Sequence, residues 1–197
     1  MLRRGLDSLL LRKVGRPLKS VKKIALGGMI AALCIVLMML TGLLPMAEFA
    51  LPALAGVLLI MLVVEISPKW AFLVYIAVAI LSLLLAPSKD SAVFFTAFLG
   101  WYPIAKSKLE NIRKPALEWI WKILIFNFSI GVGLVAAIYL FRLNDYMEIL
   151  QDSVWFLALG WLFLNVVFVI YDIALTRLIT AYIKWFRPKY IQKILGN

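Results

Sequence analysis

Residues 24–44, IALGGMIAALCIVLMMLTGLL, form an apolar run without a single charge, and this run decides the fold. A helix that crosses the hydrocarbon core of a bilayer, about 30 Å thick, needs roughly 20 such residues. A secretory signal peptide has a shorter apolar region that ends in a small-residue cleavage site, and no such site follows here. We therefore predict that residues 24–44 form a retained first membrane span.

The composition extends this prediction to the whole chain. Hydrophobic residues make up 64% of the 197 residues and charged residues only 16%, whereas a soluble domain has about 45–50% apolar and about 25% charged residues. In water such a chain would expose large apolar surfaces, while in lipid the same surfaces are well solvated. The length allows one compact bundle and no separate soluble domain.

Further apolar runs follow the first, separated by short breaks that carry proline, serine or charged residues. Their approximate bounds are 50–66, 70–86, 92–105, 119–141 and 154–176. The sequence therefore predicts an all-α membrane protein, a single bundle of six transmembrane helices joined by short loops. The chain then divides into a basic cytoplasmic arm (1–23), the transmembrane bundle (24–176) and a basic cytoplasmic or interfacial tail (177–197).

The lysine and arginine residues predict the orientation of this bundle. Basic residues near the ends of membrane spans stay on the cytoplasmic side. With the N-terminus inside, the inner segments hold 19 of the 21 Lys and Arg residues, and the outer segments hold only Lys89 and Arg142. Both termini are therefore predicted to be cytoplasmic. The net charge of +11 then indicates contact with anionic lipid at that face, and not with nucleic acid.

Several classes of function are disfavoured by what the sequence lacks. It has no histidine, the commonest general base and metal ligand. Its one cysteine, Cys34, excludes an intrachain disulfide and a thiolate metal cluster. No phosphate-binding loop of the type GxxxxGK[ST] occurs. We therefore predict a protein that is not an enzyme and has no cofactor or metal, and any energy coupling must come from a partner.

The candidate ligand-binding residues are polar and aromatic side chains inside the spans or near the outer face. They are Glu48, Phe94, Phe95, Asn127, Trp155, Trp161 and Asn165. Glu48, on the first outer loop, would either cap a ligand or be a solvated turn residue, and the two phenylalanines would add an aromatic wall. A buried asparagine either bridges two helices or binds a ligand. The tryptophans would equally serve as interface anchors.

Two further carboxylates lie near the inner ends of predicted spans, where ionisable groups are costly unless they are paired. Glu65 has Lys69 four residues further on, and Asp172 has Arg177 close behind it. We predict that each carboxylate forms a structural ion pair with its neighbour in the sequence. Neither looks like a substrate site that faces outward.

The remaining signals lie in the tail and at the end of the fourth predicted span. Residues 182–195, YIKWFRPKYIQKIL, mix aromatic and basic residues, which is typical of a helix lying in the inner interface. Pro188 is expected to break or kink this helix. The segment Gly100-Trp101-Tyr102-Pro103 is distinctive, but its residue types indicate no particular chemistry.

Small residues recur at a spacing of four in the first span. Gly27 and Ala31 form one such pair, and Gly28 and Ala32 form another. Small residues at this spacing make a flat stripe that allows another helix to approach closely. The spacing alone leaves two interpretations open, packing within the bundle and docking onto a separate protein.

The segment Lys22–Leu33, KKIALGGMIAAL, resembles the opening of the substrate-binding S components of energy-coupling factor (ECF) transporters. These proteins are similar in length and have six helices and two cytoplasmic ends. Residues 51–56, LPALAG, also resemble the start of the family's second helix, which follows a loop that covers the ligand and would here carry Glu48. No segment resembles the signatures of the known vitamin or cobalt branches, so the substrate is left open.

This resemblance implies roles for residues and partners. Gly27, Gly28, Ala31 and Ala32 would face a transmembrane coupling subunit, which works with a pair of ATPases. A small, vitamin-like molecule would enter from outside, be held by the outer halves of helices four to six, and be released inside when the bundle topples. The resemblance implies a bacterial plasma membrane as the location.

The leading hypothesis from the sequence is therefore a substrate-capture subunit of an ECF-type uptake transporter. One alternative is a non-transporting scaffold of the cell envelope, which would bind proteins and no ligand. Another is a lipid-handling membrane protein. Co-purifying partners would distinguish the first of these from the other two.

Overall fold

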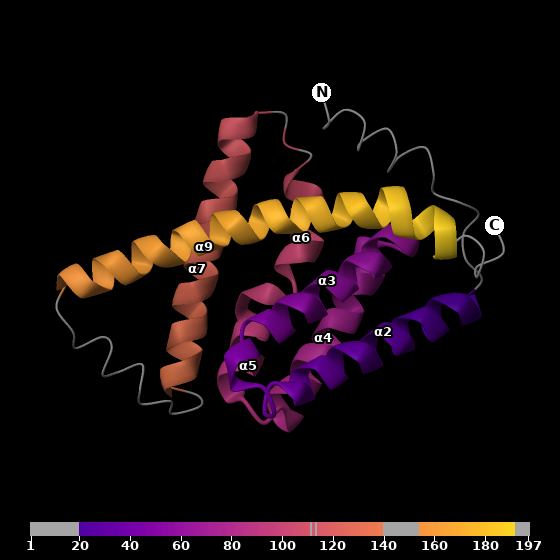
Figure 1. Cartoon of the computed structure of the whole chain (residues 1–197), viewed down its shortest axis with the longest axis horizontal. Coiled ribbons are helices and arrows are strands. Elements are labelled where there is room, and N and C mark those ends of the chain that lie inside the picture. Colours follow the sequence, from indigo (N-terminus) through magenta and orange to yellow (C-terminus); the bar gives the residue numbers. More distant parts are fainter. Residues whose placement is uncertain (1–19, 111, 113, 140–153, 192–197) are drawn as a thin grey trace.

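The computed structural model describes residues 20–110, 112, 114–139 and 154–191, and within these ranges every regular element is helical (Figure 1). Four helices are long and apolar enough to cross a membrane. They are α2 (Ser20–Leu40), α4 (Pro68–Leu85), α7 (Pro115–Tyr139) and α9 (Val154–Ala181). The predicted all-helical fold is confirmed for the described residues, and the four long helices are compatible with a multi-pass membrane protein. Most of the predicted N-terminal arm, residues 140–153 and residues 192–197 lie outside the described ranges.

The first span begins and ends four residues earlier than predicted. Helix α2 ends at Leu40, and the hydroxyl of Thr41 donates a hydrogen bond to the carbonyl of Met38 over 2.7 Å. The next residue, Gly42, packs against the turn that follows α4. A Cβ atom at Gly42 would lie only 2.5 Å from the Cβ of Pro87, so the close approach of these two turns requires glycine.

The second and third predicted spans are α3 (Ala50–Glu65) and α4, and their bounds agree closely with the prediction. With 16 residues, α3 is about 24 Å long, which is shorter than the hydrocarbon core. Helices α2, α3 and α4 share one core of small and branched side chains. Cys34 lies fully buried in this core, and its thiol donates to the carbonyl of Ala55 over 3.4 Å. Cys34 is therefore a packing residue.

The fourth predicted span, residues 92–105, is not one continuous helix. It is divided into α5 (Lys89–Phe94), the π-helical segment η2 (Phe95–Leu99) and α6 (Tyr102–Leu109). Residues 100–101 form the turn between η2 and α6, and this turn packs closely against α4. A Cβ at Gly100 would lie 2.7 Å from Cε2 of Tyr75 and 2.8 Å from Cζ of Phe95, so only glycine lets this turn pack against α4. Pro103 follows in the first turn of α6, where its missing N–H costs nothing.

Helix α3 and segment η2 approach each other backbone to backbone. A Cβ atom placed at Gly56 of α3 would lie 2.1 Å from the carbonyl oxygen of Leu99 and 3.1 Å from its carbonyl carbon. Glycine is therefore the residue that allows η2 to lie against α3. This contact fixes the position of η2 relative to α3.

Helix α9 crosses the other helices and contacts α7 and α3 (Figure 1). Among its described side chains, only Phe168, Asp172 and Leu175 are buried, a narrow stripe along one face. Phe168 stacks on Phe126 of α7 at a centroid distance of 4.5 Å, within a second core that also contains Phe98 and Tyr102. Most of α9 is exposed and apolar, which suits a helix surrounded by lipid.

In place of the break or kink predicted at Pro188, the tail shows a change of helix type. The α-helical geometry of α9 ends at Ala181, and the backbone continues as the π-helical segment η3 (Tyr182–Ile191) through Pro188. A wider helix of this kind changes the hydrogen-bond register without a sharp stop.

Candidate functional site

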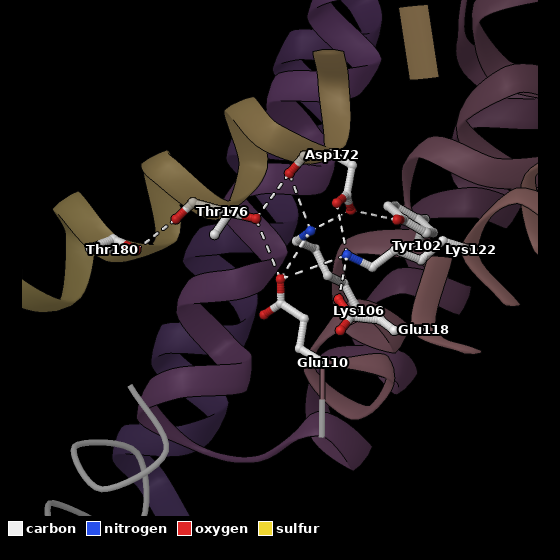
Figure 2. A network of polar contacts seen from close by, with 8 residues as sticks. All are labelled: Tyr102, Lys106, Glu110, Glu118, Lys122, Asp172, Thr176 and Thr180. Atoms are coloured by element: carbon white, nitrogen blue, oxygen red, sulfur yellow. Dashed lines mark hydrogen bonds and ion pairs between the residues drawn. The ribbon is translucent and has the colours of Figure 1, made fainter. Parts of the chain in front are cut away.

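Charged side chains from α6, α7 and α9 converge in the interior (Figure 2). We call this group the charge cluster. It consists of Tyr102, Lys106, Glu110, Glu118, Lys122 and Asp172. The side chains of Lys106 and Glu118 are fully buried, and those of Lys122 and Asp172 are 2% and 3% exposed. Ionisable groups buried to this degree occur in membrane proteins only when they are paired, and they are candidates for function.

Asp172 is the centre of the charge cluster. Its Oδ1 atom accepts hydrogen bonds from the Tyr102 hydroxyl, over 2.6 Å, and from the ammonium group of Lys106. Its Oδ2 atom accepts from Nζ of Lys122 over 2.7 Å. Lys106 also donates to the backbone carbonyl of Asp172 over 3.1 Å. Both carboxylate oxygens are thus occupied, and one residue of α9 is bound to α6 and α7 together.

Two further carboxylates complete the charge cluster. Lys106 and Glu110 form an ion pair at 3.1 Å, and Lys122 and Glu118 form one at 3.0 Å, each with i,i+4 spacing on its own helix. Three carboxylates therefore surround two ammonium groups. Because the groups satisfy one another, the charge cluster joins three helices and presents no open ligand site.

The carboxylates predicted to pair locally have other partners in the structure. Asp172 pairs with Lys106 and Lys122, since Arg177 lies five residues on and thus about 140° around the helix axis. Glu65 pairs with Nε of Arg187 at 2.8 Å. The predicted pairs with Arg177 and Lys69 were therefore wrong.

The Glu65–Lys69 pair is absent because a helix boundary lies between the two residues. Helix α3 ends at Glu65 and α4 begins at Pro68, so Glu65 and Lys69 do not share a continuous helix. Glu65 instead meets segment η3, where the Tyr182 hydroxyl donates to its Oε1 over 3.2 Å in addition to the bond from Arg187. These contacts fasten the C-terminal segment to the end of α3.

Lys106 and Lys122, two of the 19 basic residues predicted to lie in the inner segments, are both buried inside the protein. A signal for the charge cluster was nevertheless present in the sequence. Glu110 and Glu118 each lie four residues from one of these lysines, at the spacing of a helical ion pair. An aspartate such as Asp172 inside an apolar run also requires a cationic partner.

A separate cavity of about 480 Å³ lies between α5–η2 and α7, beside the end of α4. Its walls include Thr96, Ala97 and Trp101 on one side and Phe128, Ser129 and Gly133 on the other. Among the described residues that line it, none is charged. Its volume is in the range of about 300–1,000 Å³ that is typical of small-molecule sites. The cavity is therefore the better candidate for a binding site.

None of the seven predicted ligand-binding residues is among those lining this cavity. Phe95 is fully buried against Tyr75, at a centroid distance of 5.9 Å, and Phe94 meets Phe49 edge to face at 5.0 Å. Glu48 accepts a hydrogen bond from the Ser88 hydroxyl over 3.3 Å. The contacts of Glu48 and Phe94 join the turn between α2 and α3 to α5. The structure thus brings Glu48 and Phe94 to the same end of the bundle, in packing contacts.

Asn127 and Asn165 bridge two helices, which is one of the two interpretations left open by the sequence. Their amides form reciprocal hydrogen bonds of 3.0 and 3.3 Å between α7 and α9. The amide of Asn165 also donates to the carbonyl of Trp161 over 2.9 Å. Trp161 and Trp155 are themselves exposed on α9, Trp155 to 82%. The amide pair therefore contributes to packing between α7 and α9.

Replacing both amides of this pair should cost less than the sum of the two single replacements. We expect Asn127→Leu to lower the free energy of unfolding by about 0.6–1.7 kcal/mol, because the amide of Asn165 loses its interhelical partner. The double variant Asn127→Leu/Asn165→Leu should be less destabilised than the sum of the two single variants. Thermal unfolding in mild detergent measures all three variants, and strictly additive losses would contradict the bridge.

The small-residue stripe of the first span is divided between two faces of α2. Gly27 is buried, and a Cβ there would lie 3.5 Å from Cγ2 of Val74, while Ala31 packs against the first core. Gly28 and Ala32 are exposed, and a Cβ at Gly28 would meet nothing within 4 Å. One half of the stripe therefore packs within the bundle and the other half lies on the free surface.

Comparison with known proteins identifies no relative of this chain. No protein-family model, curated protein or solved structure matches this chain. The resemblance to S components therefore depends on the sequence alone, on residues 22–33 and 51–56 together with the length and the predicted six-helix plan.

Proposed function

We propose that this chain is the membrane-embedded substrate-capture subunit of an ECF-type uptake transporter, driven by a separate coupling subunit and a pair of ATPases. The observation that carries the proposal is the cavity of about 480 Å³ between α5–η2 and α7. These elements are the fourth and fifth predicted membrane segments, where the resemblance implies that the ligand is held. The cavity has the size of a small-molecule site, and it is separate from the charge cluster.

The distribution of charge supports the sidedness that capture from outside requires. In the proposed topology six segments cross a bacterial plasma membrane and both termini are cytoplasmic. Helix α3 and the combined segment 89–109 then supply the two crossings beyond the four long helices. The lining residues Val93 and Ala136 lie toward the outer ends of their segments in this arrangement, so the cavity is closer to the outer face.

The exposed half of the α2 stripe supports contact with a coupling subunit. Gly28 and Ala32 leave a flat strip of helix on the surface of the bundle. Two helices in lipid associate through close van der Waals contact, and small residues permit that contact. Gly27 and Ala31 are occupied by packing inside the bundle, so the proposed contact uses the other pair.

Purification from the native membrane tests the proposal. We expect the tagged protein to retain a transmembrane coupling subunit and ATPases in mild detergent, identified by mass spectrometry. Gly28→Leu should reduce the recovery of these partners at least tenfold, because the leucine side chain separates the helices. Gly160→Leu is the matched control, since Gly160 is an exposed helical glycine on α9 that also has nothing within 4 Å of a Cβ.

Two outcomes would reject the capture role. One is a protein that is recovered alone from its native membrane under conditions that preserve membrane complexes. The other is a protein recovered with cell-envelope machinery, which would favour the scaffold interpretation. Equal recovery of partners with Gly28→Leu and Gly160→Leu would show that the contact with the coupling subunit does not involve Gly28 of α2.

A lipid-handling protein is the second candidate, and one observation favours it. The rim of the cavity includes Phe128, which is 72% exposed, and the exposed residues Leu124 and Val132. The cavity is therefore accessible from the apolar surface of the protein. Co-purifying ATPases would decide between this role and that of a capture subunit.

A further inference from the structure

The turn between α2 and α3, residues 41–49, exposes large apolar side chains, and we call it the apolar turn. It lies beside the end of α4, because Gly42 packs against Pro87. Six large apolar residues are exposed at this end of the bundle, namely Leu43, Leu44, Met46 and Phe49 on the turn and Leu84 and Leu85 on α4. An exposed apolar patch of this kind marks contact with a partner or with a membrane.

The charged side chains described at the same end are half-buried. They are Glu48, Lys89 and Asp90. Glu48 accepts a hydrogen bond from the Ser88 hydroxyl over 3.3 Å, and the ammonium group of Lys89 donates to the carbonyl of Leu83 over 3.0 Å. On a turn that faces water, the charged side chains are normally the exposed ones. Here the order is reversed, which indicates surroundings other than water.

The opposite end of α3 has the pattern of a membrane–water interface. Glu65, the last residue of α3, accepts a hydrogen bond from Arg187 of η3 over 2.8 Å. Lysines are exposed at this end, Lys69 at the start of α4 and Lys184 in η3, and an exposed tryptophan follows each of them in the chain. Basic and aromatic residues together are typical of the interface. This end of α3 therefore lies at the lipid headgroups.

Helix α3 is too short to carry the apolar turn from that interface to water on the other side. Its 16 residues extend about 24 Å, whereas the hydrocarbon core is about 30 Å thick, so the helix ends about 6 Å short. Any tilt of the helix shortens its reach further. The apolar turn lies at the end of α3 away from η3 (Figure 1), and this length places it within the hydrocarbon of the far leaflet.

The backbone of the apolar turn suits that environment, where polar groups must find partners within the protein. Pro45 has no N–H group. The Ser91 hydroxyl donates to the carbonyl of Glu48 over 2.9 Å. Four N–H groups of the turn donate to carbonyls of residues 39–44, namely those of Gly42, Leu43, Leu44 and Ala47. The turn can therefore enter lipid with these groups already paired.

We propose that the apolar turn is immersed in the hydrocarbon of the leaflet opposite η3, with lipid acyl chains as its partner. Its exposed surface continues the apolar surface of α2 and α4, where Met39 and Leu81 are also exposed, so one lipid environment covers helices and turn. The inward contacts of Glu48 and Lys89 hold these charges away from the acyl chains. The proposal requires that α2, α3 and α4 cross the membrane, and it does not depend on the capture role.

A spin label on the turn tests the proposal. Met46→Cys is labelled with a nitroxide in the full chain, which is reconstituted in nanodiscs of palmitoyl-oleoyl phosphatidylcholine. Met46 is fully exposed, so the label disturbs no packing, and Leu43→Cys provides a second position. Cys34 is fully buried, and wild type treated with the same reagent is the blank. Power saturation measures collisions with oxygen, which enters hydrocarbon, and with a polar nickel chelate, which stays in water.

Two labelled positions on α4 are the controls. Lys69→Cys is exposed at the end of the bundle near η3, and Ile76→Cys is exposed at the middle of the helix. We expect the ratio of oxygen to nickel collisions at Met46 to exceed the ratio at Lys69 about tenfold, because a polar chelate partitions poorly into hydrocarbon. The ratio at Met46 should be closer to that at Ile76, and Leu43 should agree with Met46.

Two results would overturn the proposal. A ratio at Met46 as low as that at Lys69 would show that the apolar turn lies in water. Low collision rates with both reagents would show that protein covers the turn, from a partner or from a second copy of this chain. The capture role is decided separately by the co-purification of ATPases, so either idea can fail without the other.

Discussion

Asp172→Leu is expected to destabilise the protein by about 3–5 kcal/mol, the range for removing one partner of a buried ion pair. The substitution would leave the ammonium groups of Lys106 and Lys122 without the carboxylate that now accepts from both. It also removes the acceptor of the Tyr102 hydroxyl. Unfolding in mild detergent, followed by circular dichroism, measures the loss.

Two further variants make this prediction specific. Arg177→Gln changes the residue that the sequence predicts as the partner of Asp172, and it should change stability by less than about 0.5 kcal/mol, as for an exposed residue. The double variant Asp172→Leu/Lys106→Met removes an ammonium group together with the carboxylate that accepts from it, so the charge cluster keeps its original net charge, and it should recover much of the loss. A loss in Asp172→Leu no larger than that in Arg177→Gln would contradict the charge cluster.

Gly56→Ala should be the most disruptive exchange of a glycine described in the structure. The added methyl group would lie 2.1 Å from the carbonyl oxygen of Leu99, and a backbone atom cannot move away as a side chain can. Helix α3 and segment η2 would have to separate. We expect a loss of about 3 kcal/mol or more, at or above the upper end for overpacked cores.

Gly131→Ala is the control for this prediction. Gly131 also lies within a helix, but a Cβ there would meet nothing within 4 Å. The exchange should be neutral or stabilising by up to about 1 kcal/mol, because alanine loses less conformational entropy than glycine in a helix. Similar unfolding temperatures for Gly56→Ala and Gly131→Ala would show that the approach of α3 to η2 is looser than described.

Periodicity and hydropathy were sufficient to predict most of the helices, because apolar length is a local property. The bounds of α3 and α4 agree with the predicted spans within two residues. The division of the fourth span at residues 100–101 was not predicted, and the turn there packs against Tyr75, which is distant in the sequence. The same break gives a role to the segment 100–103, whose Tyr102 reaches Asp172.

The candidate site could not be predicted in the same way. The charge cluster joins residues up to 70 positions apart, and local spacing cannot show which of two lysines a distant carboxylate meets. Most of the residues lining the cavity are ordinary apolar side chains, which carry no signal of their own. Conspicuous residues such as Glu48 and Asn165 attracted the functional interpretation, and in the structure they form contacts between elements.

Helix α9 packs against the other helices through only a narrow buried stripe, and this has a consequence for the biogenesis of the protein. In the proposed topology α9 leaves the ribosome after α6 and α7, and an aspartate on a helix alone in lipid costs about 2.5–3.5 kcal/mol or more, depending on its depth. Lys106 and Lys122 remove that cost only after α6 and α7 are in place, so insertion has a built-in order. The N-terminal helices can associate through their own core, whereas α9 is recruited by charge.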